Sequence, residues 1–202
     1  NDSDDVSLFD FSNALFITEG QVDENIPIRP DCFYVLHNCT KNQYADLPNK
    51  IALQVYLTAV RDNPDAEEVE PYIFYDVKNR GLYMPWGTDL LPFEIDQIKG
   101  QISSLKRQPV FHWIGTIGEG LFGNKAQLDP FIKACKENQI GFLPNDPWAH
   151  PISAQEHIKR AQLSFVFPAI VGQWQKEHGY IPCRIFKAIS YGNFGVTNSS
   201  EV

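Results

Sequence analysis

The sequence predicts an α/β protein built from two lobes, with a parallel sheet flanked by helices in the second lobe. Before residue 92 the apolar runs are short, rich in β-branched and aromatic residues, and bounded by Pro, Asn, Asp or Gly, as buried strands are. After residue 92 strand-like and helix-like patterns alternate, which favours a parallel sheet covered on both faces. This change of pattern divides the chain into lobes at 1–92 and 93–202.

The first lobe contains strand-like runs with few helical patterns between them. It is therefore either a strand-rich lobe or an incomplete one that lacks helices preceding it. Its expected strands are 13–18, 32–37, 51–60, 72–75 and 82–84.

The second lobe shows both periodicities in turn. Ser153 and Glu156, three residues apart, predict a capping box at the start of one helix, and Gly192 is suited to end the last helix. The expected helices are 93–107, 128–138, 153–161 and 183–191, and the expected strands are 110–114, 140–143, 163–167 and 194–197.

Composition and charge narrow the class of protein. The 202 residues are 43% hydrophobic and 21% charged, so the chain can bury a core. The net charge of −8 and the pI of about 5.0 argue against a broad basic surface, so no nucleic-acid partner is expected. Acidic residues gather at 2–5 and 62–70, and we expect both runs to be solvated.

The cysteines and the apolar runs bear on cofactors and localisation. No two of the four cysteines are spaced as CxxC, so no metal site or cofactor is expected. No apolar run reaches the roughly 18 residues of a membrane span, and no signal peptide is recognisable. We therefore expect a cytoplasmic protein with reduced thiols that does not span a membrane.

The strongest candidate site lies in residues 179–198, where a proline turn precedes a short helix that carries Arg184 and Lys187. These cations are three residues apart and share a helix face. A helix that begins at the crevice of an α/β sheet directs its first amides at an anion placed there. Two cations beside those amides suit a diphosphate. The alternative is an ordinary amphipathic helix whose cations face water.

Residues 181–192, IPCRIFKAISYG, resemble the donor-binding helix of GT-B glycosyltransferases, particularly the glycosyl transferases group 1 and CgeB-like families. The resemblance implies Rossmann-like lobes and is best over the second half of the chain. Many relatives have a ribose-binding Glu where this chain has Lys187, so Lys187 either contacts phosphate or marks an altered site. The donor-binding residues implied in this segment are Tyr180, Pro182, Arg184, Lys187 and Asn198.

A second candidate is the glycine-rich stretch 114–125, IGTIGEGLFGNK, which follows a predicted strand. Glycines let backbone amides approach a phosphate closely, although the stretch matches neither a P-loop nor GxGxxG. The GT-B resemblance places Gly118, Glu119 and Gly120 in the cleft near the donor phosphates. The alternative is a plain loop.

Other residues are candidates for the cleft and for catalysis. By the same resemblance, Trp86 and Asp89 in residues 82–92 belong to the connection between lobes and are candidates to line the cleft, or they form a structural turn. A turn containing Trp148 is suited to enclose a nucleobase. His37 ends a strand of the first lobe, where a catalytic base for the acceptor is expected, and Glu19 is the alternative base.

The sequence thus predicts a metal-independent glycosyltransferase that moves a sugar from a nucleoside diphosphate to an acceptor hydroxyl. Its substrates are a nucleotide sugar and a carbohydrate, lipid or protein acceptor. Two alternatives stay open: a non-catalytic nucleotide- or sugar-binding domain, and a nucleotide-sugar epimerase of the same fold.

Overall fold

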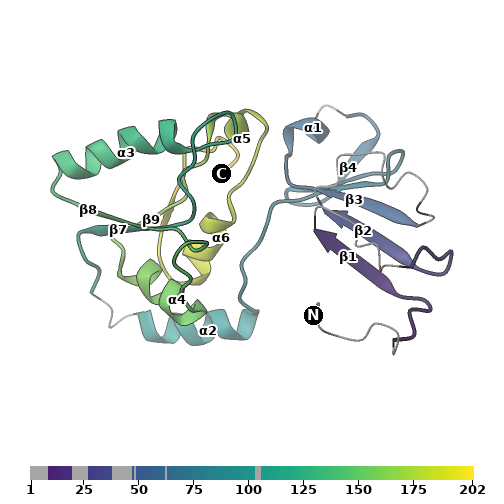
Figure 1. Cartoon of the computed structure of the whole chain (residues 1–202), viewed down its shortest axis with the longest axis horizontal. Coiled ribbons are helices and arrows are strands. Elements are labelled where there is room, and N and C mark those ends of the chain that lie inside the picture. The colour runs from purple at the N-terminus through teal and green to yellow at the C-terminus, as the bar shows by residue number, and fades with distance from the viewer. Residues whose placement is uncertain (1–8, 20–26, 38–46, 48, 62, 103–105) are drawn as a thin grey trace. The chain divides into compact units, whose positions relative to one another are not determined.

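The computed structural model describes residues 9–19, 27–37, 47, 49–61, 63–102 and 106–202. These residues form two compact units that divide between Met84 and Pro85 (Figure 1). The sequence placed the boundary near Pro92, so the segment 85–91 joins the second unit. The first unit is rich in β-strands, and the second is an α/β unit.

The first unit is built on one mixed sheet of six strands in the order β1-β2-β3-β6-β5-β4. The neighbours β1, β2, β3 and β6 are parallel, whereas β5 is antiparallel to both β6 and β4. The elements are β1 (Leu15–Glu19), β2 (Phe33–His37), β3 (Lys50–Gln54), α1 (Thr58–Arg61), β4 (Ala66–Glu70), β5 (Ile73–Asp76) and β6 (Gly81–Tyr83).

One face of the parallel strands carries the core of this unit. Tyr34 and Leu36 alternate along β2 toward a cluster that includes Cys32 and Leu47, and the ring of Phe16 stacks on Tyr34 at 5.4 Å. Leu15 and Ile17, at odd positions of β1, are instead exposed. Side chains on β1 and β2 therefore divide between a buried and a more exposed face.

Two sequence expectations for this unit need correction. The strand expected at 51–60 ends at Gln54, and Thr58–Arg61 is helical because Leu57 and Val60, three residues apart, are both buried. Of the acidic run at 62–70, the described side chains of Asp65, Glu67, Glu68 and Glu70 are exposed as expected, but part of the run forms the edge strand β4, and residue 62 lies outside the described residues. Its glutamates face water, where an edge strand tolerates charge.

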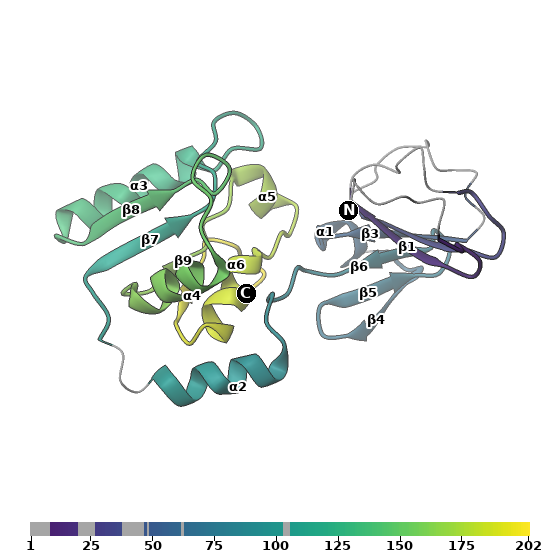
Figure 2. The same ribbon diagram turned by 60° about the horizontal axis from the view of Figure 1, so that its bottom comes forward.

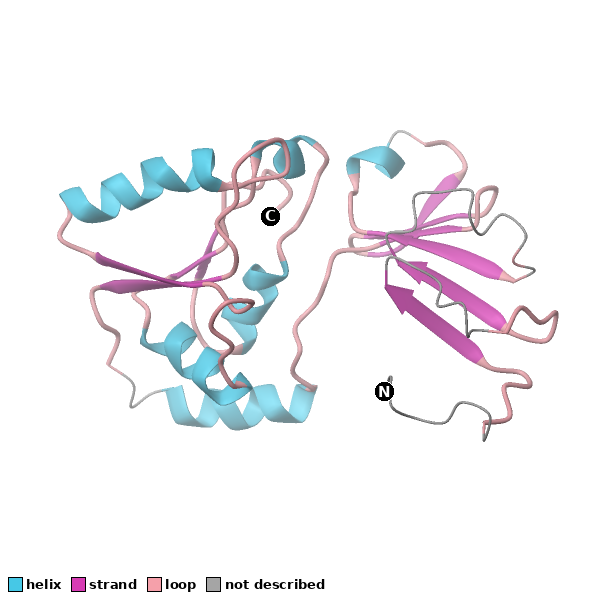
Figure 3. Cartoon of the chain, in the orientation of Figure 1, coloured by secondary structure: helices cyan, strands magenta, loops and turns pink. Residues whose placement is uncertain are grey.

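The second unit is a layered α/β body in which helices cover both faces of parallel strand pairs. The strands β7 and β8 pair in parallel, as do β9 and β10. Figures 1, 2 and 3 show α3 on one side of the strands and α4 with α2 on the other. The elements are α2 (Pro92–Gln101), β7 (Val110–Ile114), α3 (Lys125–Glu137), β8 (Gly141–Asn145), α4 (Ala154–Leu163), β9 (Phe167–Pro168), α5 (Gln173–Glu177), α6 (Cys183–Ser190) and β10 (Gly195–Val196).

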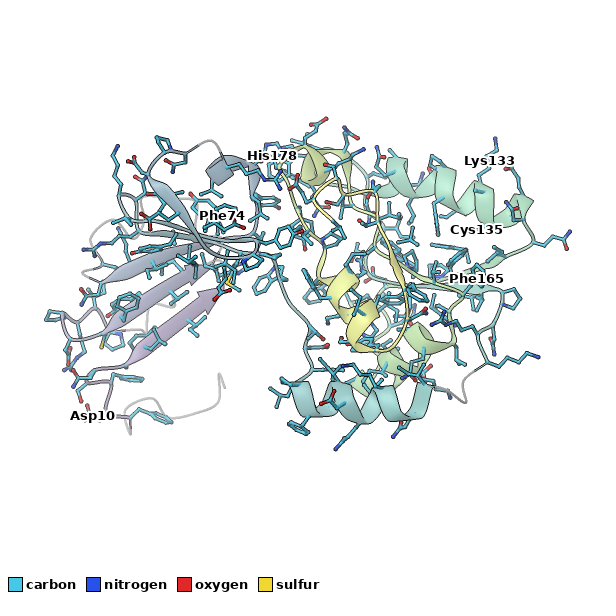
Figure 4. All side chains as sticks on the ribbon, turned by 180° about the vertical axis from the view of Figure 1, so that it is seen from behind. Asp10, Phe74, Lys133, Cys135, Phe165 and His178 are labelled. Carbon is cyan, nitrogen blue, oxygen red and sulfur yellow. The ribbon has the colours of Figure 1, made fainter. Side chains whose placement is uncertain are left out.

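Two apolar clusters lie on opposite faces of β7, because successive side chains of a strand point to opposite sides. Trp113 packs with Leu128 of α3, whereas Ile114 packs with Ala161 of α4. Figure 4 shows Cys135 on the face of α3 that meets the strands and Lys133 on the opposite face. The alternation of strand and helix predicted for this half is confirmed up to β9, after which α5 and α6 follow one another, and the predicted parallel sheet consists of two two-stranded parallel sheets.

Local signals at the helix ends are largely confirmed. The Ser153 hydroxyl accepts a hydrogen bond from the amide of Glu156 at 3.2 Å, so Ser153 caps α4. The Glu156 carboxylate binds Arg160 at 2.7 Å instead of completing the capping box. Gly192 follows α6 with φ of +82°, the left-handed conformation that glycine adopts easily. The strand expected at 163–167 is shorter and later, at Phe167–Pro168.

Asn193 joins three segments of this unit from a buried position. Its amide nitrogen donates to the carbonyls of Ala161 and Ser164 at 2.6 and 2.9 Å, and its side-chain oxygen accepts from the amide of Phe194. We expect Asn193→Ala to lower the free energy of unfolding by about 2 kcal/mol, because it leaves buried carbonyls without donors. Urea unfolding measures the change, with Asn138→Ala, at an exposed hydrogen bond to Ala134, as the control.

Two further expectations concern thiols and membranes. Cys32, Cys135 and Cys183 are free thiols, as predicted, and Cys39 lies outside the described residues. In the described ranges, no helix combines the length and apolar character needed to cross a membrane.

Candidate functional site

A cavity of about 370 Å³ opens where the glycine-rich loop after β7, the turn after β8 and the start of α6 meet within the second unit. Parallel α/β sheets place ligands beyond the carboxyl ends of their strands, and this cavity has that position relative to β7 and β8. We call it the glycine-loop pocket. Its lining residues are Gly115, Thr116, Gly118, Phe122, Gly123, Asn124, Pro147, Trp148, Ile170, Val171, Gln175, Tyr180, Pro182, Cys183 and Arg184.

Arg184 supplies the positive charge of this pocket. Its Nε donates to the carbonyl of Ile114 at 3.1 Å, and its guanidinium lies 4.2 Å from the ring centre of Trp113. Burial lowers the pKa of Arg184, and no carboxylate among the described residues counters it. A partly buried guanidinium held in place without a counter-charge is a ready partner for an anion.

The backbone around Arg184 adds hydrogen-bond donors. Pro182 precedes the first turn of α6, where Cys183 and Arg184 carry amides that have no carbonyl partner within the helix. The helix dipole favours negative charge at this end. Gly115 has φ of +148°, and a Cβ at that position would overlap the Arg184 guanidinium, so the loop passes directly over the cation. The pocket therefore combines a cation and helix amides in one place.

The glycine-rich loop is held by close backbone contacts. The Gly118 amide donates to the Asn124 side chain at 3.1 Å. A Cβ on Gly123 would overlap the backbone of Gly118, and one on Gly172 would overlap the carbonyl of Gly123. Glycine at both positions lets the loop pack against the residue that precedes α5.

Aromatic rings border the pocket. Trp148 is 88% exposed and lies on the turn after β8, where its amide donates to Asp146 at 3.0 Å. Phe122, from the glycine-rich loop, meets Trp174 edge-to-face at 4.9 Å, and Trp174 stacks on His178 at 3.9 Å. An exposed planar ring suits stacking with a nucleobase, and the nearby Arg184 guanidinium suits the phosphate attached to it.

Lys187 lies beside a second cavity of about 390 Å³, which we call the lysine pocket. Its ammonium binds the Asp89 carboxylate at 3.0 Å, and the Tyr191 hydroxyl donates to the same carboxylate at 2.6 Å. Burial acts to raise the pKa of Asp89, but the hydrogen bonds from Tyr191 and Lys187 outweigh it and leave the pKa below its ordinary value. Burial together with Asp89 raises the pKa of Tyr191. Arg184 therefore lines the glycine-loop pocket and Lys187 lines the lysine pocket.

The remaining predicted donor residues divide between sites. Gly118 and Pro182 line the glycine-loop pocket, and Tyr180 lines both this pocket and the lysine pocket. Glu119 and Gly120 line a smaller cavity of about 230 Å³ beside Lys125, which lies 3.5 Å from the Glu119 carboxylate.

Asn198 has a different role in the structure. Its side chain accepts from the amide of Val171 at 2.9 Å and donates to the carbonyl of the same residue at 3.0 Å. It thereby fixes Val171, which lines the glycine-loop pocket. Sequence reasoning missed Val171 and Gln175, because the loop after β9 and the short helix α5 carry no motif; the glycine before α5 was the only available signal.

The two candidate bases of the first unit are neighbours in its sheet. Glu19 and His37 are register partners at the carboxyl ends of the parallel strands β1 and β2. His37 is buried, with 3% of its surface exposed. The side chain of Glu19 lies outside the described part, so its proximity to His37 is known from the backbone alone.

His157 of α4 is close enough to Lys187, Asp89 and Arg184 for their charges to act on its pKa. Its ring contacts Tyr191 edge-to-face at 5.5 Å, and its Nε2 is buried with no hydrogen-bond partner among the described residues. Burial, with a smaller contribution from Lys187, lowers the pKa of His157 to about 4.

This histidine makes the fold sensitive to acid. The unfolded chain protonates His157 near its ordinary pKa of 6.5, whereas the folded chain resists protonation down to about 4. Between these values the unfolded state binds more protons, so stability is expected to fall as the pH drops from about 6.5 to 4. Urea unfolding at about pH 7 and pH 4.5 measures this loss. His157→Gln should reduce it, whereas His150→Gln, at an exposed position, should not.

Comparison with known proteins adds no relative: no family model, curated protein or solved structure matches the chain. Among the described residues, no group of three His, Cys, Asp or Glu side chains is placed to hold a metal ion. We therefore infer the function from the geometry of the glycine-loop pocket.

Proposed function

We propose that the second unit binds a nucleoside diphosphate sugar in the glycine-loop pocket and is the donor lobe of a GT-B glycosyltransferase. One observation carries the proposal. Arg184 is a fixed guanidinium with no carboxylate partner in the part of the chain that the structure describes, and it lies in the first turn of α6 beside the glycine-rich loop. That combination suits the diphosphate of a donor.

The rest of the pocket supports a nucleotide over a free phosphate. A volume of about 370 Å³ exceeds what a phosphate group needs, and the aromatic rings of Trp148 and Phe122 border it. The nucleobase would lie against one of these rings. The diphosphate would accept hydrogen bonds from Arg184 and from the amides of Cys183 and Arg184.

In this mechanism the cation and the amides stabilise the negative charge that develops on the leaving diphosphate, so no metal ion is needed. Glu19 and His37 are the candidate bases that accept the proton of the acceptor hydroxyl. His37 and Glu19 end adjacent parallel strands, where α/β units present such groups. The acceptor itself is a carbohydrate, lipid or protein hydroxyl.

Thermal unfolding with UDP, GDP, ADP and their sugars tests the donor site. A ligand that binds only the folded state at a hundredfold excess over its Kd should stabilise the protein by about 2.7 kcal/mol. Stabilisation by one nucleotide family supports the proposal and identifies the donor. If none of these ligands stabilises the chain at millimolar concentration, the donor site is refuted.

The two alternatives make different predictions in an assay of product. Transfer of sugar to an added acceptor supports the glycosyltransferase, whereas an inverted sugar without acceptor supports an epimerase. Binding with neither product supports a nucleotide-binding domain without catalysis. The ion pair of Lys187 with Asp89 favours this last alternative slightly, because it occupies a cation otherwise available for phosphate.

A further inference from the structure

The lysine pocket differs from the glycine-loop pocket in its charge. Arg184 leaves the glycine-loop pocket with a positive charge, whereas in the lysine pocket the ammonium of Lys187 and the carboxylate of Asp89 pair at 3.0 Å. A free anion is repelled by Asp89 there, and a free cation by Lys187. The lysine pocket therefore suits a ligand that is neutral but rich in hydrogen-bonding groups.

The paired groups offer donors and acceptors side by side. A carboxylate has about four lone-pair sites and an ammonium three N–H donors. The Asp89 carboxylate accepts from Lys187, from Tyr191 and from its own backbone amide, which leaves a lone-pair site open, and Lys187 uses one of its donors in this pair. The side chain of Asp89 is 45% exposed and that of Lys187 is 21% exposed, so a ligand can reach both. Adjacent hydroxyls, which donate and accept at once, match this set.

An aromatic surface completes the chemistry. Trp86 lines the lysine pocket and is 39% exposed. The C–H groups on one face of a pyranose ring are apolar, and an indole is the side chain best able to cover them while hydroxyls at the ring edge bind polar groups. At about 390 Å³ the cavity is large enough for one hexose.

The two pockets adjoin each other. Tyr180 and Cys183 line both of them, and successive turns of α6 supply Arg184 to one and Lys187 to the other. A ligand with a charged part in the first pocket and a neutral part in the second would therefore cross the residues Tyr180 and Cys183.

We propose that the lysine pocket binds a neutral pyranose ring, with Trp86 covering one face of the ring and Asp89 and Lys187 binding its hydroxyls. That this ring is the sugar of the donor rests on the proposed function. A pyranose ring of the acceptor would make the same contacts. In either case residues 86–89 determine sugar specificity, and the Asp89–Lys187 pair has a binding role besides its structural one.

The full chain and its Trp86→Ala variant are to be titrated calorimetrically with UDP, UDP-glucose, GDP and GDP-mannose. Loss of the aromatic face should weaken the nucleotide sugar about tenfold and leave the matching nucleoside diphosphate unchanged. Phe122→Ala is the matched control, because Phe122 lines the glycine-loop pocket and not the lysine pocket, so its loss should affect nucleotide and nucleotide sugar alike. Equal weakening of both ligands by Trp86→Ala overturns the proposal.

Free methyl glucoside separates this proposal from the donor assignment. At tens of millimolar it should shift the NMR resonance of the Trp86 indole N–H, which Trp86→Phe identifies by its disappearance. If methyl glucoside shifts this resonance and no nucleotide binds, the pyranose site is not part of a donor site, and only the proposed function is refuted. A shift with methyl glucoside that UDP-glucose abolishes assigns the ring to the donor, and one that persists assigns it to the acceptor. If neither methyl glucoside nor any nucleotide sugar perturbs Trp86, the pyranose site is refuted.

Discussion

Replacing Arg184 with alanine is expected to weaken binding of the nucleoside diphosphate by about a hundredfold or more, with the fold retained. The guanidinium is the charge that the pocket directs at the diphosphate, and it is held by the carbonyl of Ile114 and the ring of Trp113. Calorimetric titration with the nucleotide that stabilises the wild-type chain measures the loss.

A matched arginine provides the control for this experiment. Arg107 also combines a ring contact, 5.1 Å to the centre of Phe194, with a hydrogen bond to a backbone carbonyl, that of Gly192. It does not line the glycine-loop pocket. Arg107→Ala should therefore leave affinity unchanged. Wild-type affinity in a folded Arg184→Ala protein would remove the main support for the donor site.

Gly123→Ala is expected to lower the free energy of unfolding by about 1–3 kcal/mol and to weaken nucleotide binding. The added Cβ would overlap the carbonyl of Gly118 and approach the carbonyl carbon of Glu119 to 2.6 Å, so the loop has to open. Because Gly118 lines the pocket, this opening changes the shape of the binding site. Urea unfolding and calorimetric titration measure the two effects.

Gly118→Ala is the control within the same loop. A Cβ there would lie 3.7 Å from the Cα of Gly123, an ordinary contact. Alanine also reduces the conformational freedom of the unfolded chain, which offsets small costs in the folded state. We expect a change in stability within about 0.5 kcal/mol. Similar losses for Gly118→Ala and Gly123→Ala would show that the close backbone contact is not what holds the loop.

The sequence predicted most of the second unit because its signals are local. Hydrophobic periodicity identified α3 and β7, and Ser153 and Gly192 fixed helix ends through their own hydrogen bonds and backbone freedom. The failures have non-local causes. The apolar residues of β3 continue into the helical turn Thr58–Arg61, so the sequence predicts one long strand. The end of the strand and the start of the helix depend on which of these side chains the folded unit buries.

The candidate site was predicted less completely than the fold. Pro182 and Arg184 were found because they form a sequence motif, and both line the glycine-loop pocket. The pairing of Lys187 with Asp89 joins residues far apart in the chain, and no spacing rule reports it. Asn198 was expected at the ligand, but its two hydrogen bonds go to the backbone of Val171. Sequence spacing places residues on an element, whereas tertiary packing decides which pocket they face.

The division between Met84 and Pro85 has a practical consequence for studying the ligand. Each residue that lines the glycine-loop and lysine pockets follows Pro85, and the second unit has its own apolar clusters on both sides of its strands. A fragment of residues 85–202 should therefore fold as an independent domain and keep both cavities. Spectra of this shorter polypeptide would contain fewer resonances, so atomic-level ligand mapping could proceed without the first unit.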